Sequence, residues 1–182
     1  MKFAQLFLLV LAFLLVKPAE AGLLIEPVAG FSFSKFEPSN LKEFSSNGVN
    51  YGGRLGYQNL GFQLGLDYLS GSENVTSSNI KKSYEHTEWA AFAGFEFPVL
   101  FRVYAGYIFA ADGETKHKTL GKVSFNNGTG MKLGVGFTGL PFVDINFEYR
   151  SGTYDKTKMG GINTGKTDFS GFMIAASLPF VI

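Results

Sequence analysis

Apolar and polar residues alternate with a period of two along much of the chain. Between residues 142 and 150, every second side chain is apolar (Val143, Ile145, Phe147 and Tyr149) and those between are polar or charged (Asp144, Asn146, Glu148 and Arg150). Residues 49–57 and 60–68 repeat the pattern, with glycines among the polar positions. Successive side chains of a β-strand point to opposite faces, so each segment predicts a strand with one apolar face. Repeated segments of about ten residues with this alternation are typical of a transmembrane β-barrel.

Eight segments of the chain carry this strand signal. We predict strands at Leu24–Ser34, Val49–Tyr57, Leu60–Ser70, Thr87–Phe97, Leu100–Ala111, Thr129–Thr138, Phe142–Ser151 and Phe169–Ile182. No segment after residue 21 is apolar for 18 residues, and none keeps the 3.6-residue period of a helix. The sequence therefore predicts an all-β fold, an eight-stranded antiparallel up-and-down transmembrane β-barrel.

The predicted connections alternate between short and long. The short ones are Gln58-Asn59, Pro98-Val99 and Gly139–Pro141. The long, polar ones are Lys35–Gly48, Gly71–His86, Asp112–Gly128 and Gly152–Asp168. Outer-membrane barrels have short periplasmic turns and long external loops, so we expect the long connections outside the cell. The even number of strands then places both termini on the periplasmic side.

The two faces of the predicted strands differ in size as well as polarity. The apolar face carries most of the aromatic rings, whereas the other face carries Gly52, Gly56, Gly61, Gly65, Gly94, Gly106, Gly134 and Gly136. A soluble lipocalin-like barrel would turn the apolar face inward. However, the interior of an eight-stranded barrel is only just wide enough to be filled by side chains, so the rings would overpack it. We therefore expect the aromatic face in lipid and the glycine-rich, charged face inside.

The inward face carries ten charged residues. They are the acids Glu26, Asp67, Glu88, Glu96, Asp144 and Glu148 and the bases Arg54, Arg102, Lys132 and Arg150. Hairpin registers centred on the short turns place Lys132 opposite Glu148, Glu96 opposite Arg102 and Arg54 opposite Gln63. On the neighbouring first strand, Glu26 lies at the depth of Arg54. Because unpaired buried charges are costly, we interpret the ten as an interior ion-pair network that fills the lumen. An ion-conducting lumen is the alternative.

The first residues have the features of a secretory signal peptide. Lys2 precedes an apolar run from Phe3 to Val16, and Ala19-Glu20-Ala21 forms an A-x-A cleavage signal before Gly22. This run is shorter than the roughly 20 residues that a spanning helix needs, although an uncleaved anchor is the alternative reading. We expect residues 1–21 to be removed between Ala21 and Gly22. The barrel domain then comprises residues 22–182.

Composition excludes several classes of function. The chain has no cysteine, which rules out disulfides and thiolate metal sites. Without Lys2, Lys17 and Glu20, the 16 basic and 15 acidic residues become 14 of each, so nothing recommends a nucleic-acid partner. No cluster of His, Asp and Glu has the spacing of metal ligands. We therefore expect neither a metal nor a cofactor.

With these strands, connections and inward charges, residues 22–182 resemble the small outer-membrane β-barrel family typified by the OmpA transmembrane domain and OmpX. The resemblance implies interior ion pairs, assembly by the barrel-assembly machinery and contact with outer-membrane lipid. It also implies a monomeric, non-enzymatic protein of a Gram-negative envelope with a structural or surface-interaction role. We expect the long external loops to provide the contacts with any external ligand or surface.

Two other functions remain open from the sequence. The first is a narrow, porin-like channel for ions or small solutes. The second is a lipid A-modifying enzyme at the outer rim, where His86 lies close in sequence to Glu85, Glu88 and the serines at positions 77 and 78. A nucleophile, a base and an acid must be in hydrogen-bond contact for such chemistry.

Overall fold

The computed structural model describes residues 21–39, 42–77, 80–98, 100–117 and 121–182. Its strands are β1 (Gly22–Pro38), β2 (Phe44–Asn59), β3 (Phe62–Ser77), β4 (Ile80–Glu96), β5 (Phe101–His117), β6 (Gly121–Phe137), β7 (Asp144–Met159), β8 (Ile162–Ser177) and the two-residue β9 (Phe180–Val181). The predicted signal peptide, up to residue 20, lies outside the described residues. Among those residues no helix has the length and hydropathy of a membrane span.

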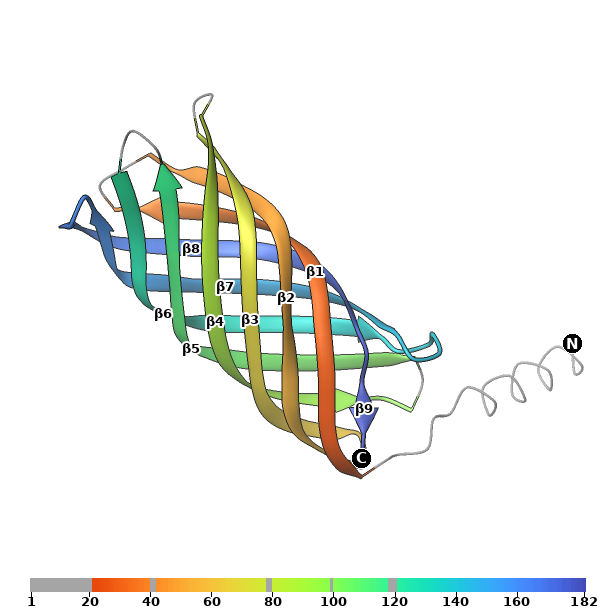
Figure 1. Cartoon of the computed structure of the whole chain (residues 1–182). Coiled ribbons are helices and arrows are strands. Elements are labelled where there is room, and N and C mark those ends of the chain that lie inside the picture. Colours follow the sequence, from red (N-terminus) through yellow and green to blue (C-terminus); the bar gives the residue numbers. More distant parts are fainter. Residues whose placement is uncertain (1–20, 40–41, 78–79, 99, 118–120) are drawn as a thin grey trace, which may run out of the picture.

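The strands form a closed antiparallel up-and-down barrel. Each of β1–β8 pairs with its neighbour in sequence, and β1 also pairs with β8, which closes the sheet (Figure 1). Pro179 cannot donate a ladder hydrogen bond, and pairing at this seam stops after Ser177. It resumes at β9, which pairs with Leu24 and Ile25 of β1. The predicted eight-stranded fold is confirmed, with β9 as a short continuation of β8.

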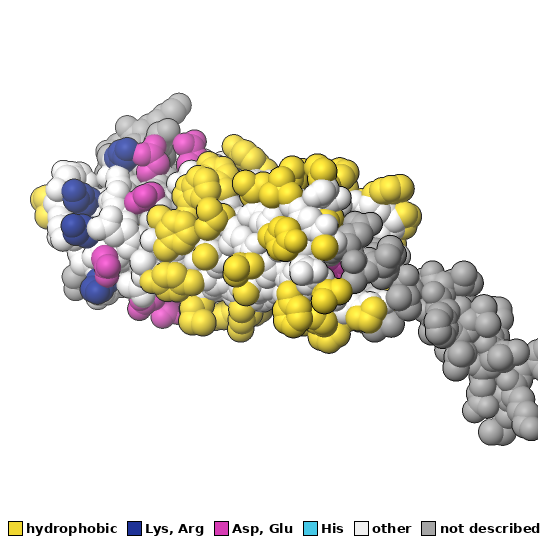
Figure 2. Space-filling model, turned by 90° about the horizontal axis from the view of Figure 1, so that it is seen from below, with side chains coloured by type: hydrophobic (Ala, Val, Ile, Leu, Met, Phe, Trp, Pro, Cys, Tyr) yellow, Lys and Arg dark blue, Asp and Glu magenta, His cyan; other side chains and the backbone are white. Residues whose placement is uncertain are grey.

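The orientation of the two faces is confirmed. Outward side chains form a broad apolar band around the barrel, which Figure 2 shows in yellow. We call this band the belt; among its members are Phe31, Phe33, Tyr51, Leu55, Tyr57, Phe62, Leu64, Trp89, Phe101, Tyr107, Leu133, Phe147, Phe172 and Ile174, all exposed. Charged side chains gather on the outer surface at the end opposite the termini. Glycines on the inner face leave room for the buried side chains around them.

The prediction of four long external loops is wrong. Most of their residues belong to strands, and β7 and β8 are joined only by Gly160 and Gly161, whose φ angles are 58° and 89°. The strands continue past the belt, where the outward residues are polar and the inward ones include buried aromatic rings as well as polar residues. The outward apolar face that marked the strands in the sequence is therefore lost while the backbone ladder persists, which is why the sequence pattern indicated loops.

Two of the predicted hairpin registers are also wrong. The turn after β2 is formed by Leu60 and Gly61, with φ angles of 50° and 84°, as in a type I′ turn, and not by Gln58-Asn59. Arg54 consequently lies opposite Asp67 rather than Gln63. In the β6–β7 hairpin, Lys132 lies opposite Arg150 rather than Glu148.

The register predicted for the β4–β5 hairpin is correct, with Glu96 opposite Arg102. The two wrong registers are displaced by four and two residues. Because side chains alternate with a period of two, an even displacement leaves every side chain on its predicted face.

Candidate functional site: the filled lumen and the outer rim

Arg54 of β2 joins three carboxylates in the centre of the lumen. Its Nε donates to Asp67 Oδ2 at 2.9 Å, and its Nη1 and Nη2 lie 3.4 Å from Glu26 Oε1 and 3.2 Å from Glu148 Oε2. The guanidinium also lies over the ring of Tyr104, 4.2 Å from its centroid. The three acids come from β3, β1 and β7, so this one arginine ties distant walls of the barrel together.

Arg102 of β5 forms a second group, nearer the end where the termini lie. It bonds Glu26, and its Nη1 is 3.6 Å from Asp144 Oδ2. Its Nε donates to Asn146 Oδ1 at 3.1 Å. Opposite Arg102 on β4, Glu96 is half-buried and accepts a hydrogen bond from Gln63 Nε2 at 3.5 Å.

Lys132 does not pair with Glu148 as the sequence predicted. Its Nζ donates to Asp67 Oδ2 at 2.5 Å and lies 3.9 Å from Glu88 Oε1. The register explains the difference, because it places Arg150 across from Lys132, and the lysine instead reaches over the lumen to β3 and β4. Arg150 lies 3.5 Å from Glu88 and 3.7 Å from Glu148.

The structure brings the ten predicted residues onto one inner surface. Glu26, Arg54, Asp67, Glu88, Arg102, Lys132, Asp144, Glu148 and Arg150 are buried, and Glu96 is half-buried. We call these ten the central network. Because several carboxylates are shared between two bases, the network is a connected cluster rather than a set of separate pairs.

Sequence reasoning missed one buried acid, Glu73. It accepts hydrogen bonds from the hydroxyl of Ser32, at 2.5 Å, and from that of Ser46. Asn50 in turn donates to Ser32 Oγ at 2.6 Å. Residue 73 falls in a segment that we predicted to be a loop. The inward positions of β3 continue with period two from Asp67 to Glu73, and this spacing was the available signal.

The lumen beyond the central network is filled by aromatic rings that the sequence reading also missed. We call this group the aromatic cap; it comprises Phe36, Phe44, Tyr84, Phe125, Tyr154 and Phe169. Phe36 and Phe44 stack with their centroids 4.9 Å apart, and the hydroxyls of Tyr84 and Tyr154 are 2.9 Å apart. The cap lies toward the end of the barrel opposite the termini, and its rings pack with Val75 and Ala111.

A small cavity remains between the aromatic cap and the central network. Its volume is about 20 Å³, enough for roughly one water molecule, and Glu73, His86, Glu88 and Arg150 line it. His86 is buried, and its Nδ1 has no hydrogen-bond partner among the described residues. A cavity of this size does not admit a substrate to the imidazole.

Of the rim-sited catalytic group considered from the sequence, the described residues bring only Glu88 to the cavity beside His86. The imidazole points into the barrel, whereas Glu85 is exposed on the outer face of β4. The side chains at positions 77 and 78 lie outside the described residues. Among the described residues, no group of His, Asp and Glu could hold a metal ion.

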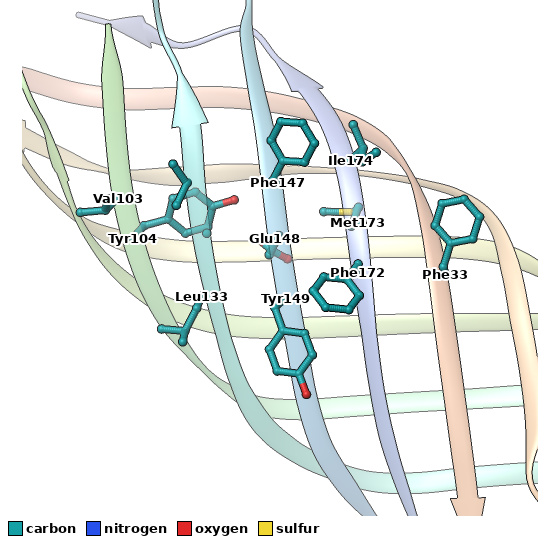
Figure 3. A pocket seen from close by; sticks show the side chains of 12 residues that line it. Phe33, Val103, Tyr104, Leu133, Phe147, Glu148, Tyr149, Phe172, Met173 and Ile174 are labelled. Atoms are coloured by element: carbon teal, nitrogen blue, oxygen red, sulfur yellow. The ribbon is translucent and has the colours of Figure 1, made fainter. Parts of the chain in front are cut away.

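A groove lies on the outside of the belt. It has a volume of about 590 Å³ and extends from Val103 of β5 across β6, β7 and β8 to Phe33 of β1. Figure 3 shows its rim of outward side chains, among them Leu133, Phe147, Tyr149 and Phe172. This apolar groove is part of the belt itself, so its chemistry suits acyl chains rather than a polar substrate.

Three lysines of the outer rim are held in ion pairs. The Nζ of Lys35 lies 2.6 Å from Glu37 and 2.9 Å from Glu43, and these hydrogen bonds raise the pKa of Lys35. Lys166 lies 2.8 Å from Asp155, whose hydrogen bond raises the pKa of Lys166.

The third of these lysines, Lys122, bonds Glu114. All three pairs lie at the surface, so each contributes at most a small amount to stability.

A closed eight-stranded barrel with an exposed apolar belt and a charged, filled lumen has the fold of the small outer-membrane β-barrel proteins. Two solved structures illustrate the likeness. Neisserial surface protein A aligns with a TM-score of 0.60 and 16% identity, covering 88% of this chain and 99% of its own. Ail, the attachment invasion locus protein of Yersinia pestis, in complex with the heparin analogue sucrose octasulfate, aligns with a TM-score of 0.60 and 14% identity, covering 87% of this chain and 99% of its own.

At these identities the likeness is one of fold. No family model matches the chain, and no curated protein matches it by sequence.

Proposed function

We propose that the protein is an integral outer-membrane barrel with a closed lumen and a non-enzymatic, structural or surface-contact role. The belt supports insertion, because so large an apolar surface is stable only against lipid or another apolar partner. The described strands close into a sheet without a free edge, as a bilayer requires of a spanning β-structure. Both termini are periplasmic in this proposal, and the protein acts as a monomer without a cofactor.

The filled lumen is the observation that carries the proposal of a closed barrel. Nine of the ten charged residues of the central network are buried, and the aromatic cap occupies the lumen beyond them. The cavity between the two has room for about one water molecule. A conducting pore would need a hydrated path past both groups, which their packing disfavours.

A role in surface contact is supported by the strands beyond the belt. They carry polar and charged side chains at the end of the barrel beyond the belt (Figure 2). The similar barrel Ail was crystallised with a heparin analogue. The end of the barrel opposite the termini is therefore where we expect contacts with other molecules.

Single-channel recording in planar bilayers tests the closed lumen. We expect the purified barrel to give no steady conductance. A large, steady conductance in the unmodified protein would favour the channel hypothesis instead.

Because the chain has no cysteine, orientation can be tested with single cysteines on intact cells. An impermeant thiol reagent should label Lys158→Cys and should leave Leu140→Cys unlabelled.

A further inference from the structure

Three lysines lie close together on the outer face of the β6–β7 hairpin. In its register, Ser124 is opposite Lys158 and Asn126 is opposite Lys156. Lys122 is two residues from Ser124, and its carbonyl accepts the amide of Gly160 at 3.2 Å. All three lysines are exposed. We call Lys122, Lys156 and Lys158 the basic patch; the register places Ser124 and Asn126 on the same face, and their hydroxyl and amide groups can form hydrogen bonds too.

Four carboxylates lie near the basic patch: Glu85, Asp112 and Glu114 line a hollow with Lys122, Ser124 and Asn126, and Asp155 directly precedes Lys156. Asp112 accepts the backbone amide of Asn127 at 3.2 Å. Asp155 binds Lys166, and Glu114 binds Lys122. Among the described residues, neither Lys156 nor Lys158 takes part in an ion pair. The ammonium groups of Lys156 and Lys158 are therefore available to an incoming anion, in contrast to those of Lys35 and Lys166, which are also exposed but paired.

The basic patch stands beyond the reach of the lipid headgroups. Tyr149 is the last outward aromatic residue of β7 before the polar part of the strand, and Lys156 follows seven residues later. At about 3.3 Å per residue the separation is roughly 23 Å along the strand, or about 16 Å along the membrane normal at a tilt of about 45°. The headgroup region adds only about 5–8 Å per leaflet. The patch thus faces the external medium.

We propose that the basic patch binds an anionic polysaccharide of the external medium, such as a sulfated chain. Lysine ammonium groups each offer three donors to sulfate or carboxylate oxygens, and Ser124 and Asn126 add neutral hydrogen bonds to sugar hydroxyls. Clustered lysines on one face attract polyanions at long range. This inference rests on the proposed surface-contact role and names its partner.

Binding of heparin to the folded full-length barrel in detergent tests the proposal. Surface plasmon resonance should detect binding by the unmodified protein. The double variant Lys156→Gln/Lys158→Gln should bind at least tenfold more weakly. For this variant, the slope of log Kd against log salt concentration should also be smaller by about 1.5–2, because two cationic contacts with heparin are lost.

The matched control is Lys35→Gln/Lys166→Gln, which removes the same charge from lysines that are already paired. It should change heparin binding by less than threefold. An equal loss in both double variants would mean that net charge alone attracts heparin, and would overturn the proposal.

Two other results would also overturn it. One is an unmodified barrel that does not bind heparin. The other is a Lys156→Gln/Lys158→Gln variant that binds heparin normally but associates more weakly with vesicles of anionic lipid. Neither result bears on the closed lumen, which the conductance measurement tests separately.

Discussion

Lys132 shows how a charge is accommodated at the level of a single residue inside a narrow barrel. Its nearest neighbour across the ladder is another cation, Arg150, and its ammonium is satisfied by Asp67 and Glu88 from two other strands. The long side chain, rather than direct opposition in one hairpin, determines the partner. A hairpin register alone therefore cannot identify the pairs of the central network, although the period of two identifies its members.

The first prediction concerns Lys132 and Asp67. Removing either charge takes the shorter of two buried ion pairs from its partner, because among the described residues Asp67 keeps only Arg54 and Lys132 keeps only Glu88, at 3.9 Å. The cost should be up to about 3–5 kcal/mol, the range for breaking a buried pair. Combining Lys132→Met with Asp67→Asn should cost less than the sum, with a coupling energy of about 0.5–3 kcal/mol. Reversible urea unfolding in liposomes measures each value.

The matched control combines Lys132→Met with Asp144→Asn, because Asp144 lies beside Arg102 and shares no ion pair with Lys132. This pair should be additive to within about 0.5 kcal/mol. Strict additivity of Lys132 and Asp67 would contradict the contact between them.

The second prediction concerns Gly134 on the inner face. A Cβ at this position would lie 2.1 Å from Cζ of Tyr104, whose ring is held against Arg54. Gly134→Ala should therefore destabilise the barrel by about 1–3 kcal/mol, as overpacking does. At Gly53 the nearest atom is 3.5 Å from the added Cβ, so Gly53→Ala should change stability by about 0.5 kcal/mol or less. Equal effects in urea unfolding would contradict the packing around Tyr104.

At the scale of the strands, the sequence predicts the membrane part well and the outer part poorly. Alternation is strong where one face meets lipid, so the eight strands and both faces could be predicted. Beyond the belt, outward residues such as Ser72 and Glu85 are polar, and the alternation no longer separates strand from loop. Phe36, Tyr84 and Tyr154 of the aromatic cap fell in or beside those supposed loops. Their inward direction depends on a register that only the assembled sheet defines.

The third prediction uses two outward positions of β3 at different depths. Leu64 is exposed within the belt, and Ser72 is exposed eight residues farther along the same face. Leu64→Arg should cost about 2–4 kcal/mol, because it places a cation near the middle of the bilayer. Ser72→Arg should cost no more than about 0.5 kcal/mol. Similar costs in a liposome unfolding assay would mean that β3 does not cross the bilayer as proposed.

Gly65, the inward neighbour of Leu64, is not a suitable control position for the Leu64→Arg experiment. A Cβ there would lie 2.3 Å from the carbonyl oxygen of Leu55. Substituting it would therefore strain the β2–β3 ladder whichever face met lipid.

At the scale of the whole molecule, the barrel has two zones along its axis on the outside and two on the inside. The belt covers the part nearer the termini, and charged side chains surround the opposite end (Figure 2). Inside, the central network and the aromatic cap follow one another in the same direction. The zones explain how one closed sheet can be stable in lipid and still present a charged surface to the medium.

Trp89 offers the most direct test of the belt, because it is the only tryptophan of the chain. It is 44% exposed on the outer face of β4, packs against Tyr68 and is followed toward the charged end by polar outward residues. Tryptophan prefers such positions at the membrane interface. After folding into liposomes, its fluorescence should be quenched strongly by lipids brominated near the headgroup and less by lipids brominated near the chain ends. Fluorescence that neither lipid quenches would contradict the central claim that the aromatic face of the barrel lies in the membrane.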